Sequence, residues 1–313
     1  MRKADLDPRA LRDFVDRLFG SAGCTIERTA EGTSTQVYRL RRGAEIFYLR
    51  VAEERAASLA PEVLVHNTLH TRGVRVPAVV HFEPFDQGLQ RSLLVTTAIR
   101  GESVFARPVD EATWAILRAA GRDLAAINSI PVEGFGWVRR DTGAATTLQA
   151  EHSANRAFVI EHVDHDLDLL RAATFSDREL DRIRWVLTVE DRRLDVEQAY
   201  LAHGDFDLTH IYQCAGHYSG IIDFGEIRGA APLYDLGHFS LHDGERIPQL
   251  LLSHLLDGYG EVTSLPPDHD RELRFISLLI GIRALARCLR HGPSEYSRYL
   301  TEAVRRASAF LGR

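Results

Sequence analysis

The stretch HGDFDLTHIYQCAGHYSGIIDFG, residues 203–225, decides the fold of this chain. It contains two apolar-rich runs, HIYQC and YSGIID, which are separated by the turn-forming pair Ala215-Gly216. Short runs joined by such a turn are typical of a β-hairpin. Pairing around the turn places Asp205 and Asp223 at the same end of the hairpin.

Two carboxylates brought together in this way match the needs of phosphoryl transfer. That reaction requires an in-line hydroxyl group and cations that neutralise the developing charge. We predict that Asp205 orients the hydroxyl. We predict that Asp223, the first residue of an Asp-Phe-Gly triplet, holds Mg²⁺.

His210 stands five residues after Asp205, where a kinase catalytic loop has an asparagine that binds metal. We predict that His210 is the second metal ligand or contacts a phosphate oxygen. Because Mg²⁺ prefers oxygen and imidazole suits transition metals, this predicts weaker Mg²⁺ binding or use of Mn²⁺. The alternative, that His210 only hydrogen-bonds the loop, stays open. His203 is expected to pack beneath the loop and hold it.

The composition is that of a soluble globular protein long enough for two lobes. The 313 residues are 45% hydrophobic and 26% charged, and the net charge of −6 includes no basic block, which argues against nucleic-acid binding. No apolar run is long enough to span a membrane, and the first residues lack the apolar core of a signal peptide. Three well-separated cysteines fit a reducing compartment. We predict a cytoplasmic monomer or homodimer.

The order of elements predicts an α+β fold with two lobes. Alternating runs such as TQVYRL and EIFYLRV, with one helix near residues 61–72, predict a small antiparallel sheet. Helical patterns follow at residues 111–128, 151–172 and 178–200, and again from about residue 246. We therefore predict a β-rich nucleotide-binding lobe over residues 1–100, with an N-terminal helix, and a helical lobe over residues 101–313.

The segments LAHGDFDLTHIY and GIIDFGEIRGAAPLYDLGHF resemble the aminoglycoside phosphotransferase family, and similarity extends over nearly the whole chain. The resemblance implies a protein-kinase-like two-lobe fold. It also implies ATP or GTP with Mg²⁺ as cofactors, and a hydroxyl group of an antibiotic or metabolite as acceptor. Most members have asparagine at the position of His210. Macrolide phosphotransferases of the same superfamily resemble this chain in having histidine there.

The nucleotide side needs a basic side chain on a strand and a glutamate on the next helix. Lys3 is the only lysine, so we predict that Arg50 contacts the phosphates and that Glu62 pairs with it. A surface role for Arg50 is the alternative. The resemblance and position add further nucleotide-binding candidates in the loop after Glu31 and in the connector after residue 95: Gly32, Thr33, Ser34, Thr97 and Ile99.

The acceptor side is expected where the resembling family places it, on the helix NRAFVIEHVDHDLDLL and after the Asp-Phe-Gly triplet. Acidic linings suit polycationic sugars, although charged helix faces are often only solvated. The weak substrate-binding candidates are Glu161, Asp164, His165, His238 and His242. Asp235 is expected to brace the catalytic loop.

The leading functional prediction is an ATP- or GTP-dependent kinase that phosphorylates a hydroxyl group of an aminoglycoside-like antibiotic, which would give antibiotic resistance. His210 favours a macrolide instead, and an ordinary metabolite is a further alternative. A nucleotide-binding pseudokinase with a sensing or scaffold role is the alternative from another class. A protein kinase is disfavoured, because no long activation segment follows the Asp-Phe-Gly triplet.

Overall fold

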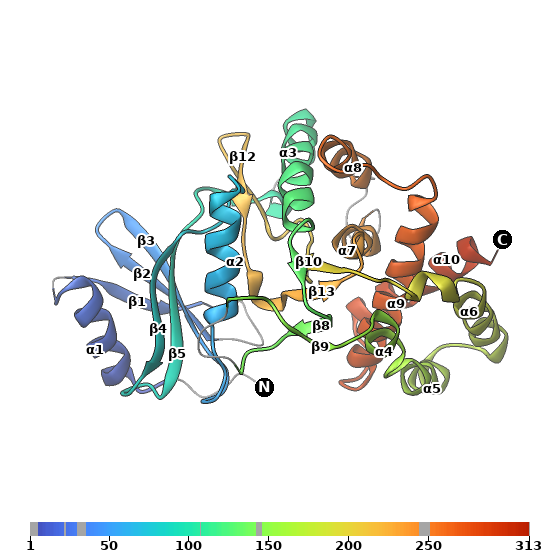
Figure 1. Cartoon of the computed structure of the whole chain (residues 1–313), viewed down its shortest axis with the longest axis horizontal. Helices are drawn as coiled ribbons and strands as arrows, with labels where there is room; N and C mark the ends of the chain where they lie inside the picture. Colours follow the sequence, from blue (N-terminus) through green and yellow to red (C-terminus); the bar gives the residue numbers. More distant parts are fainter. Residues whose placement is uncertain are drawn as a thin grey trace.

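The computed structural model describes residues 6–21, 23–29, 36–106, 108–141, 146–243 and 251–312. A sheet-rich N-terminal part and a mainly helical C-terminal part lie side by side (Figure 1), and residues of both line one large cleft. This arrangement confirms the predicted α+β fold class, in which an antiparallel sheet precedes a helical part.

The N-terminal part is a five-stranded antiparallel sheet with the strand order β1-β2-β3-β5-β4. Its strands are β1 (Thr25–Arg28), β2 (Gln36–Arg42), β3 (Glu45–Val51), β4 (Val79–Asp86) and β5 (Arg91–Thr97). Helices α1 (Pro8–Phe19) and α2 (Ala60–Thr71) lie on opposite sides of the sheet (Figure 1). Alternation along β3 buries Phe47 and Leu49 in the core with α1, so Arg50 points to the other side, towards α2.

The hairpin predicted from the sequence is confirmed. Strands β11 (Ile211–Cys214) and β12 (His217–Ile221) pair antiparallel, and Ile211 lies opposite Ile221. The turn residues Ala215 and Gly216 have φ angles of 51° and 79°, as a tight hairpin turn requires. Strand β6 (Glu102–Ser103) pairs with the other edge of β11. The open end of the hairpin faces the cleft.

Two helices predicted from the sequence are shorter than expected. Helix α6 covers Asp177–Val189 and is followed by the 3₁₀ helix η2 (Asp191–Leu194) and strand β10 (Ala199–Ala202), not by helix up to residue 200. The predicted helix over residues 151–172 is divided into α4 (Asn155–Ile160) and α5 (Val163–Ala173).

A second sheet explains the first of these differences. Strand β10 pairs with strands far away in the sequence, and such pairing outweighs a local helical pattern. The sheet order is β7-β10-β13-β8-β9, with β7 (Pro131–Val132), β8 (Phe135–Val138), β9 (Ala150–His152) and β13 (Arg228–Ala230).

The remaining helices form the bulk of the C-terminal part. They are α3 (Glu111–Ile127), α7 (Tyr234–His242), α8 (Leu252–Gly260), α9 (His269–Leu289) and α10 (Glu295–Leu311), with the 3₁₀ helices η1 (Val104–Ala106) and η3 (Phe224–Glu226). Helix α9 packs against α5, α7 and α10. Its buried side chains, such as Leu278, Ile282 and Leu285, belong to the core that joins these helices.

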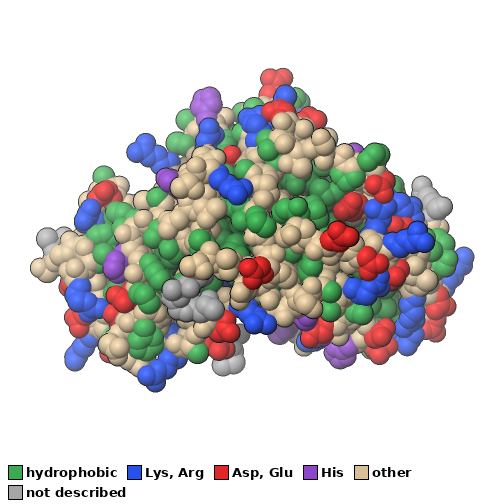
Figure 2. Space-filling model, viewed as in Figure 1, with side chains coloured by type: hydrophobic (Ala, Val, Ile, Leu, Met, Phe, Trp, Pro, Cys, Tyr) green, Lys and Arg blue, Asp and Glu red, His purple; other side chains and the backbone are tan. Residues whose placement is uncertain are grey.

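On the face shown in Figure 2, acidic and basic side chains are interspersed, which agrees with the modest net charge of the chain. None of the helices over the described ranges is both long and apolar enough to cross a lipid bilayer.

Candidate active site

Asp235 of helix α7 holds the loop that contains Asp205 in place through hydrogen bonds to its backbone. The buried Asp235 carboxylate accepts hydrogen bonds from the backbone N–H of His203 (2.8 Å) and of Gly204 (2.9 Å). Gly204 has a φ of 91°, and a Cβ atom there would collide with the Glu226 carbonyl. The bracing role predicted for Asp235 is therefore confirmed.

His203 packs inside the same loop. It is fully buried, and its Nε2 lies 2.8 Å from the carbonyl oxygen of Ile222. Its ring lies 5.0 Å from the Phe224 ring and 5.7 Å from the Phe206 ring, measured between centroids. These contacts tie the Asp205 loop to the strand exit that leads to Asp223, and they confirm the predicted packing role.

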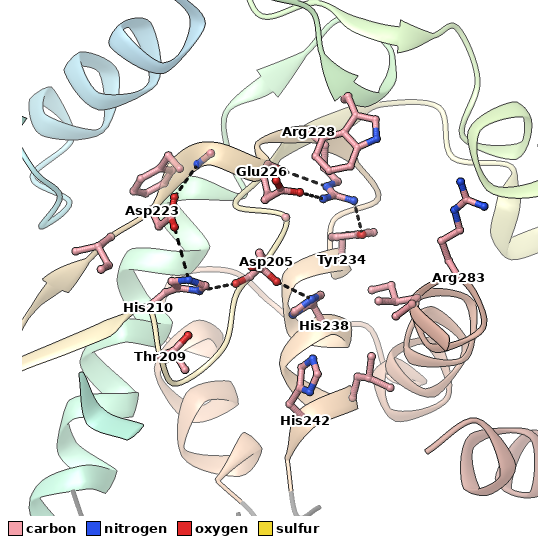
Figure 3. A pocket seen from close by; sticks show the side chains of 18 of the residues that line it. Asp205, Thr209, His210, Asp223, Glu226, Arg228, Tyr234, His238, His242 and Arg283 are labelled. Atoms are coloured by element: carbon pink, nitrogen blue, oxygen red, sulfur yellow. Dashed lines mark hydrogen bonds and ion pairs between the residues drawn. The ribbon is translucent and has the colours of Figure 1, made fainter. Parts of the chain in front are cut away.

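Asp205 projects into the cleft beside His238 (Figure 3). Its side chain is 52% exposed, and its Oδ1 lies 3.3 Å from Nε2 of His238. The other ring nitrogen, Nδ1, lies 3.1 Å from the carbonyl oxygen of Phe206, so both nitrogens face acceptors. Burial opposes a charge on His238, but Asp205 outweighs it and raises the pKa of the imidazole. In return, the hydrogen bond from His238 lowers the pKa of Asp205.

Asp205 is therefore an ionised acceptor, and its neighbour His238 takes up a proton more readily than a free histidine does. Such a carboxylate is a weak base, but it accepts a hydrogen bond from a hydroxyl group well. One of the residues predicted for the acceptor side, His238, thus lies against the predicted catalytic residue itself.

His210 and Asp223 face each other across the open end of the hairpin (Figure 3). Nδ1 of His210 lies 2.6 Å from the carbonyl oxygen of Asp205. Because a carbonyl only accepts, Nδ1 is the nitrogen that donates, and Nε2 is the atom that points to Asp223. That atom lies 4.0 Å from Oδ2 of Asp223. A metal-binding histidine is usually oriented in the same way, by donating its other N–H to a carbonyl or carboxylate.

The pair formed by His210 and Asp223 fits a metal that arrives with a nucleotide. Within the part of the chain that the structure describes, no group of three or more His, Cys, Asp or Glu side chains is arranged to hold a metal ion. Nucleotide-bound Mg²⁺ needs no such group, because phosphate oxygens and water supply most of its ligands. Burial raises the pKa of Asp223, but Arg50 and two nearby imidazoles together lower it, which keeps an anion available for a cation.

Arg50 joins this group from the N-terminal sheet. Its side chain is 16% exposed; Nη2 contacts Oδ1 of Asp223, and Nε lies 3.5 Å from Oε2 of Glu62. Burial opposes the charge of Arg50, but the two carboxylates raise its pKa. The structure thus brings together three residues singled out from the sequence, and Arg50 does not point into bulk solvent.

Arg140 is a member of this group that the sequence did not reveal. Its Nη1 contacts Oε1 of the buried Glu62, and its Nη2 donates to the Gly225 carbonyl at 2.8 Å. Arg140 follows β8 in a connecting segment, where no periodicity or motif singles it out. Arg140 lies beside helix α2 only because of the tertiary structure.

Thr97, at the end of strand β5, and Ile99 both line the cleft. The N–H of Thr97 donates to the Ala78 carbonyl, and its Oγ1 accepts from the Ala78 N–H, each at 2.9 Å. The Ile99 N–H has no hydrogen-bond partner among the described residues. The predicted phosphate-loop residues Gly32, Thr33 and Ser34 lie outside the described residues.

The cleft has a volume of about 1750 Å³ and continues to helices α5, α7 and α9. Among the residues predicted for the acceptor side, Glu161, His238 and His242 line it. Asp164 and His165 do not; both are exposed on helix α5. The acidic side chain of α5 that does line the cleft is Asp166, which is buried.

Arginines at this end also escaped the sequence analysis. The Arg228 guanidinium lies 4.1 Å from the centroid of the Trp137 ring and donates to the Tyr234 hydroxyl at 2.8 Å. Arg283 and Arg287 of helix α9 line the cleft as well. Their spacing of four residues was a usable signal, because it places both on one side of a helix.

Solved structures with this fold include phosphotransferases. Aminoglycoside phosphotransferase APH(4)-Ia superposes with a TM-score of 0.66 at 16% identity, covering 98% of this chain and 99% of that chain. A thermostable mutant of that enzyme, in a ternary complex with AMP-PNP and hygromycin B, gives 0.67 at 17% identity, covering 97% and 98%. A Thermobifida fusca YX-ER1 protein assigned as a fructosamine-3-kinase gives 0.64 at 19% identity, covering 97% and 100%.

Sequence comparison identifies the family directly. A search of the curated proteins found none that matches this chain. The model of the phosphotransferase enzyme family matches residues 25–275, which include Arg50, Asp205 and Asp223. The matched range is most of the chain, although the cleft-lining residues of helix α9, such as Arg283 and Arg287, lie beyond it. The chain therefore belongs to the phosphotransferase enzyme family and is a kinase-like small-molecule phosphotransferase.

Proposed function

We propose that this protein transfers the terminal phosphoryl group of ATP or GTP to a hydroxyl group of a small molecule, with Asp205 as the residue that orients that hydroxyl. The observation that carries the proposal is the meeting of Arg50, Asp205 and Asp223 in one cleft. Asp205 and Asp223 come from the two sides of one hairpin, and Arg50 comes from a strand that is distant in the sequence.

Each of these side chains has a role that follows from its surroundings. The ionised Asp205 carboxylate accepts a hydrogen bond from the acceptor hydroxyl and aligns its oxygen for in-line attack. Arg50, held by Glu62, presents its guanidinium to phosphate oxygens. Asp223 and His210 would hold Mg²⁺ or Mn²⁺, which, when bound, neutralises negative charge on the phosphates.

The nucleotide end offers backbone groups to a purine. We place the base beside Thr97 and Ile99, where the Ile99 N–H is available as a donor. We assign the phosphate-covering loop to Gly32, Thr33 and Ser34 on the basis of the sequence pattern. A solved structure of the same fold is a complex with AMP-PNP, which supports a nucleotide as the phosphoryl donor.

The proposal also concerns the chemical class of the acceptor molecule. An aminoglycoside-like acceptor is supported by the fold that the chain shares with a phosphotransferase bound to hygromycin B. The acidic lining expected for such a polycation is only partly present, because Asp164 and His165 lie away from the cleft and Asp166 is paired with arginine. A macrolide or a metabolite remains the alternative acceptor, and the charges of the acceptor end decide between them.

The test is Asp205→Asn. Loss of the charged acceptor should lower kcat by about 10²- to 10⁴-fold, while AMP-PNP affinity stays within about twofold, because Asp205 does not line the purine end. ADP release with an acceptor panel and calorimetric titration of AMP-PNP measure the two quantities. Asp181→Asn, at an exposed position on helix α6, is the control.

Two results would contradict the proposal. An Asp205→Asn variant with the kcat of the parent protein would remove Asp205 from the reaction. Nucleotide binding by the parent without turnover of any acceptor would instead favour the pseudokinase alternative.

A further inference from the structure

Helix α9 presents an arginine-rich side to the acceptor end of the cleft. Arg283, Arg287 and Arg290 follow one another at spacings of four and three residues, so they lie along one side of the helix. Arg283 and Arg287 line the cleft. Figure 3 shows Arg283 extending from this helix, on the side of the cleft away from Asp223.

One carboxylate faces these arginines. Both oxygens of the buried Asp166 lie 3.0 Å from Nη1 of Arg283, and Oδ1 lies 3.7 Å from Nη2 of Arg290. A single negative charge thus serves two guanidinium groups. The Arg287 side chain forms no hydrogen bond or ion pair with any residue over the ranges that the structure describes. It is a cation in the cleft without a counter-ion from those residues.

Arg287 and Asp205 line the same cleft, as do Glu226 and Tyr234. Helix α7, which carries His238 beside Asp205, packs against helix α9, which carries Arg287. Burial raises the pKa of both Glu226 and Tyr234; in agreement with the shared location, Arg287 lowers the pKa of both, and Asp205 raises it. A molecule in the cleft can therefore present one group to Asp205 and another to Arg287.

The acidic side chains nearby do not neutralise Arg287. Glu226 pairs with Arg228, at 3.7 Å. Glu161 lies 3.5 Å from the Nε2 atoms of both His152 and His162. Each of these carboxylates has a nearer cationic or potentially cationic partner than Arg287.

We propose that the acceptor carries an anionic group, a carboxylate or a phosphate, which Arg287 binds while a hydroxyl group of the same molecule lies at Asp205. A guanidinium group matches the two oxygens of such an anion with parallel hydrogen bonds. This inference rests on the proposed function, because it assigns the acceptor of that site. It disfavours polycationic sugars and favours hydroxy acids or phosphorylated polyols.

The test uses four ligands that share a six-carbon polyol chain: gluconate, sorbitol phosphate, sorbitol and glucamine. They are titrated by calorimetry into the full chain saturated with AMP-PNP and Mg²⁺. At least one of the two anionic ligands should bind about tenfold more tightly than sorbitol, the gain expected of one charge-assisted pair, and glucamine should bind least. The ratio between gluconate and sorbitol phosphate distinguishes a carboxylate from a phosphate.

Variants test whether the Arg287 side chain causes the preference for anionic ligands. Arg287→Gln should remove the preference for anions, and Arg287→Glu should reverse it in favour of glucamine, a gain that an unfolded variant cannot show. Arg274→Gln, on the same helix but outside the cleft, should keep the preference of the parent.

Three outcomes would overturn the inference. One is an equal response of the parent to all four ligands, absence of binding included. Another is tightest binding of glucamine, and the third is an anion preference that survives Arg287→Gln. If AMP-PNP binds and turnover depends on Asp205, such results overturn the acceptor class alone. If AMP-PNP does not bind, the proposed function fails, and the inference fails with it.

Discussion

Each end of the cleft contains a buried carboxylate that two arginines share. Glu62 contacts Arg50 and Arg140 at the nucleotide end, and Asp166 contacts two arginines of helix α9 at the acceptor end. Both carboxylates have side chains that are only 2% exposed. The two clusters use the same chemistry but connect different parts of the molecule.

The Glu62 cluster joins segments that are far apart. Helix α2, strand β3 and the segment after β8 meet there, and Arg140 extends the link to the Gly225 carbonyl beside Asp223. The Asp166 cluster joins only helices α5 and α9. From this difference we expect the Glu62 cluster to position groups of the proposed transfer site and the Asp166 cluster only to hold two helices together.

Breaking the Glu62 cluster should give the largest effect. Glu62→Gln removes the anion that Arg140 contacts and one of the two that Arg50 contacts, and it should lower the free energy of unfolding by about 2 to 3 kcal/mol. Misplacement of Arg50 should also lower kcat/KM for the nucleotide by about 100-fold. Urea unfolding and initial rates at varied nucleotide concentration measure the two effects.

The matched control is Asp166→Asn at the other end. It should cost a similar amount of stability, about 2 to 3 kcal/mol, because the burial and the pairing are alike. Its effect on KM for the nucleotide should stay within about twofold, since the site is distant. An equal loss of nucleotide kcat/KM in both variants would show that general destabilisation, rather than the position of Arg50, explains the first result.

His210 allows a test of the metal at the nucleotide end. An imidazole favours Mn²⁺ over Mg²⁺ relative to an amide oxygen, so His210→Asn should raise the Mg²⁺-to-Mn²⁺ ratio of activities by about tenfold. Titration of Mn²⁺ by electron paramagnetic resonance, with AMP-PNP present, should show weaker Mn²⁺ binding in the variant. An unchanged ratio together with unchanged Mn²⁺ binding would mean that His210 only holds the loop, through the Asp205 carbonyl.

The residues predicted for the nucleotide end lie together more fully than those predicted for the acceptor end, and the reason is physical. Asp205, His210 and Asp223 lie on one hairpin, and a hairpin follows from local alternation and a turn. Arg50 and Glu62 lie on consecutive elements, a strand and the next helix. Arg140 reaches the same cluster from a distant segment, so only tertiary structure could place it there.

At the acceptor end, the density of charged residues in the sequence did not predict which side chains line the cleft. The run from residue 161 to 168 is rich in acidic residues and histidine, but helical geometry turns Asp164 and His165 outward and Asp166 inward. The helix predicted for residues 178–200 failed at its C-terminal end for a similar reason. Residues 199–202 form a strand because they pair with β7 and β13, and local periodicity cannot predict pairing with such distant strands.

The smallest expected effect comes from His238, the positioning residue beside Asp205. Its pKa in the folded protein is raised above the ordinary 6.5, so its ion pair with Asp205 stabilises the fold below that pH and is lost as pH rises through the raised value. His238→Gln should therefore lower the free energy of unfolding near about pH 6, by no more than about 1 kcal/mol because Asp205 is half exposed, and should have no effect near about pH 9. Because the lowered pKa of Asp205 returns towards its ordinary value in the variant, the acid limb of the kcat profile should also move to higher pH. A purely structural role for His238 would give a stability loss independent of pH and an unmoved acid limb.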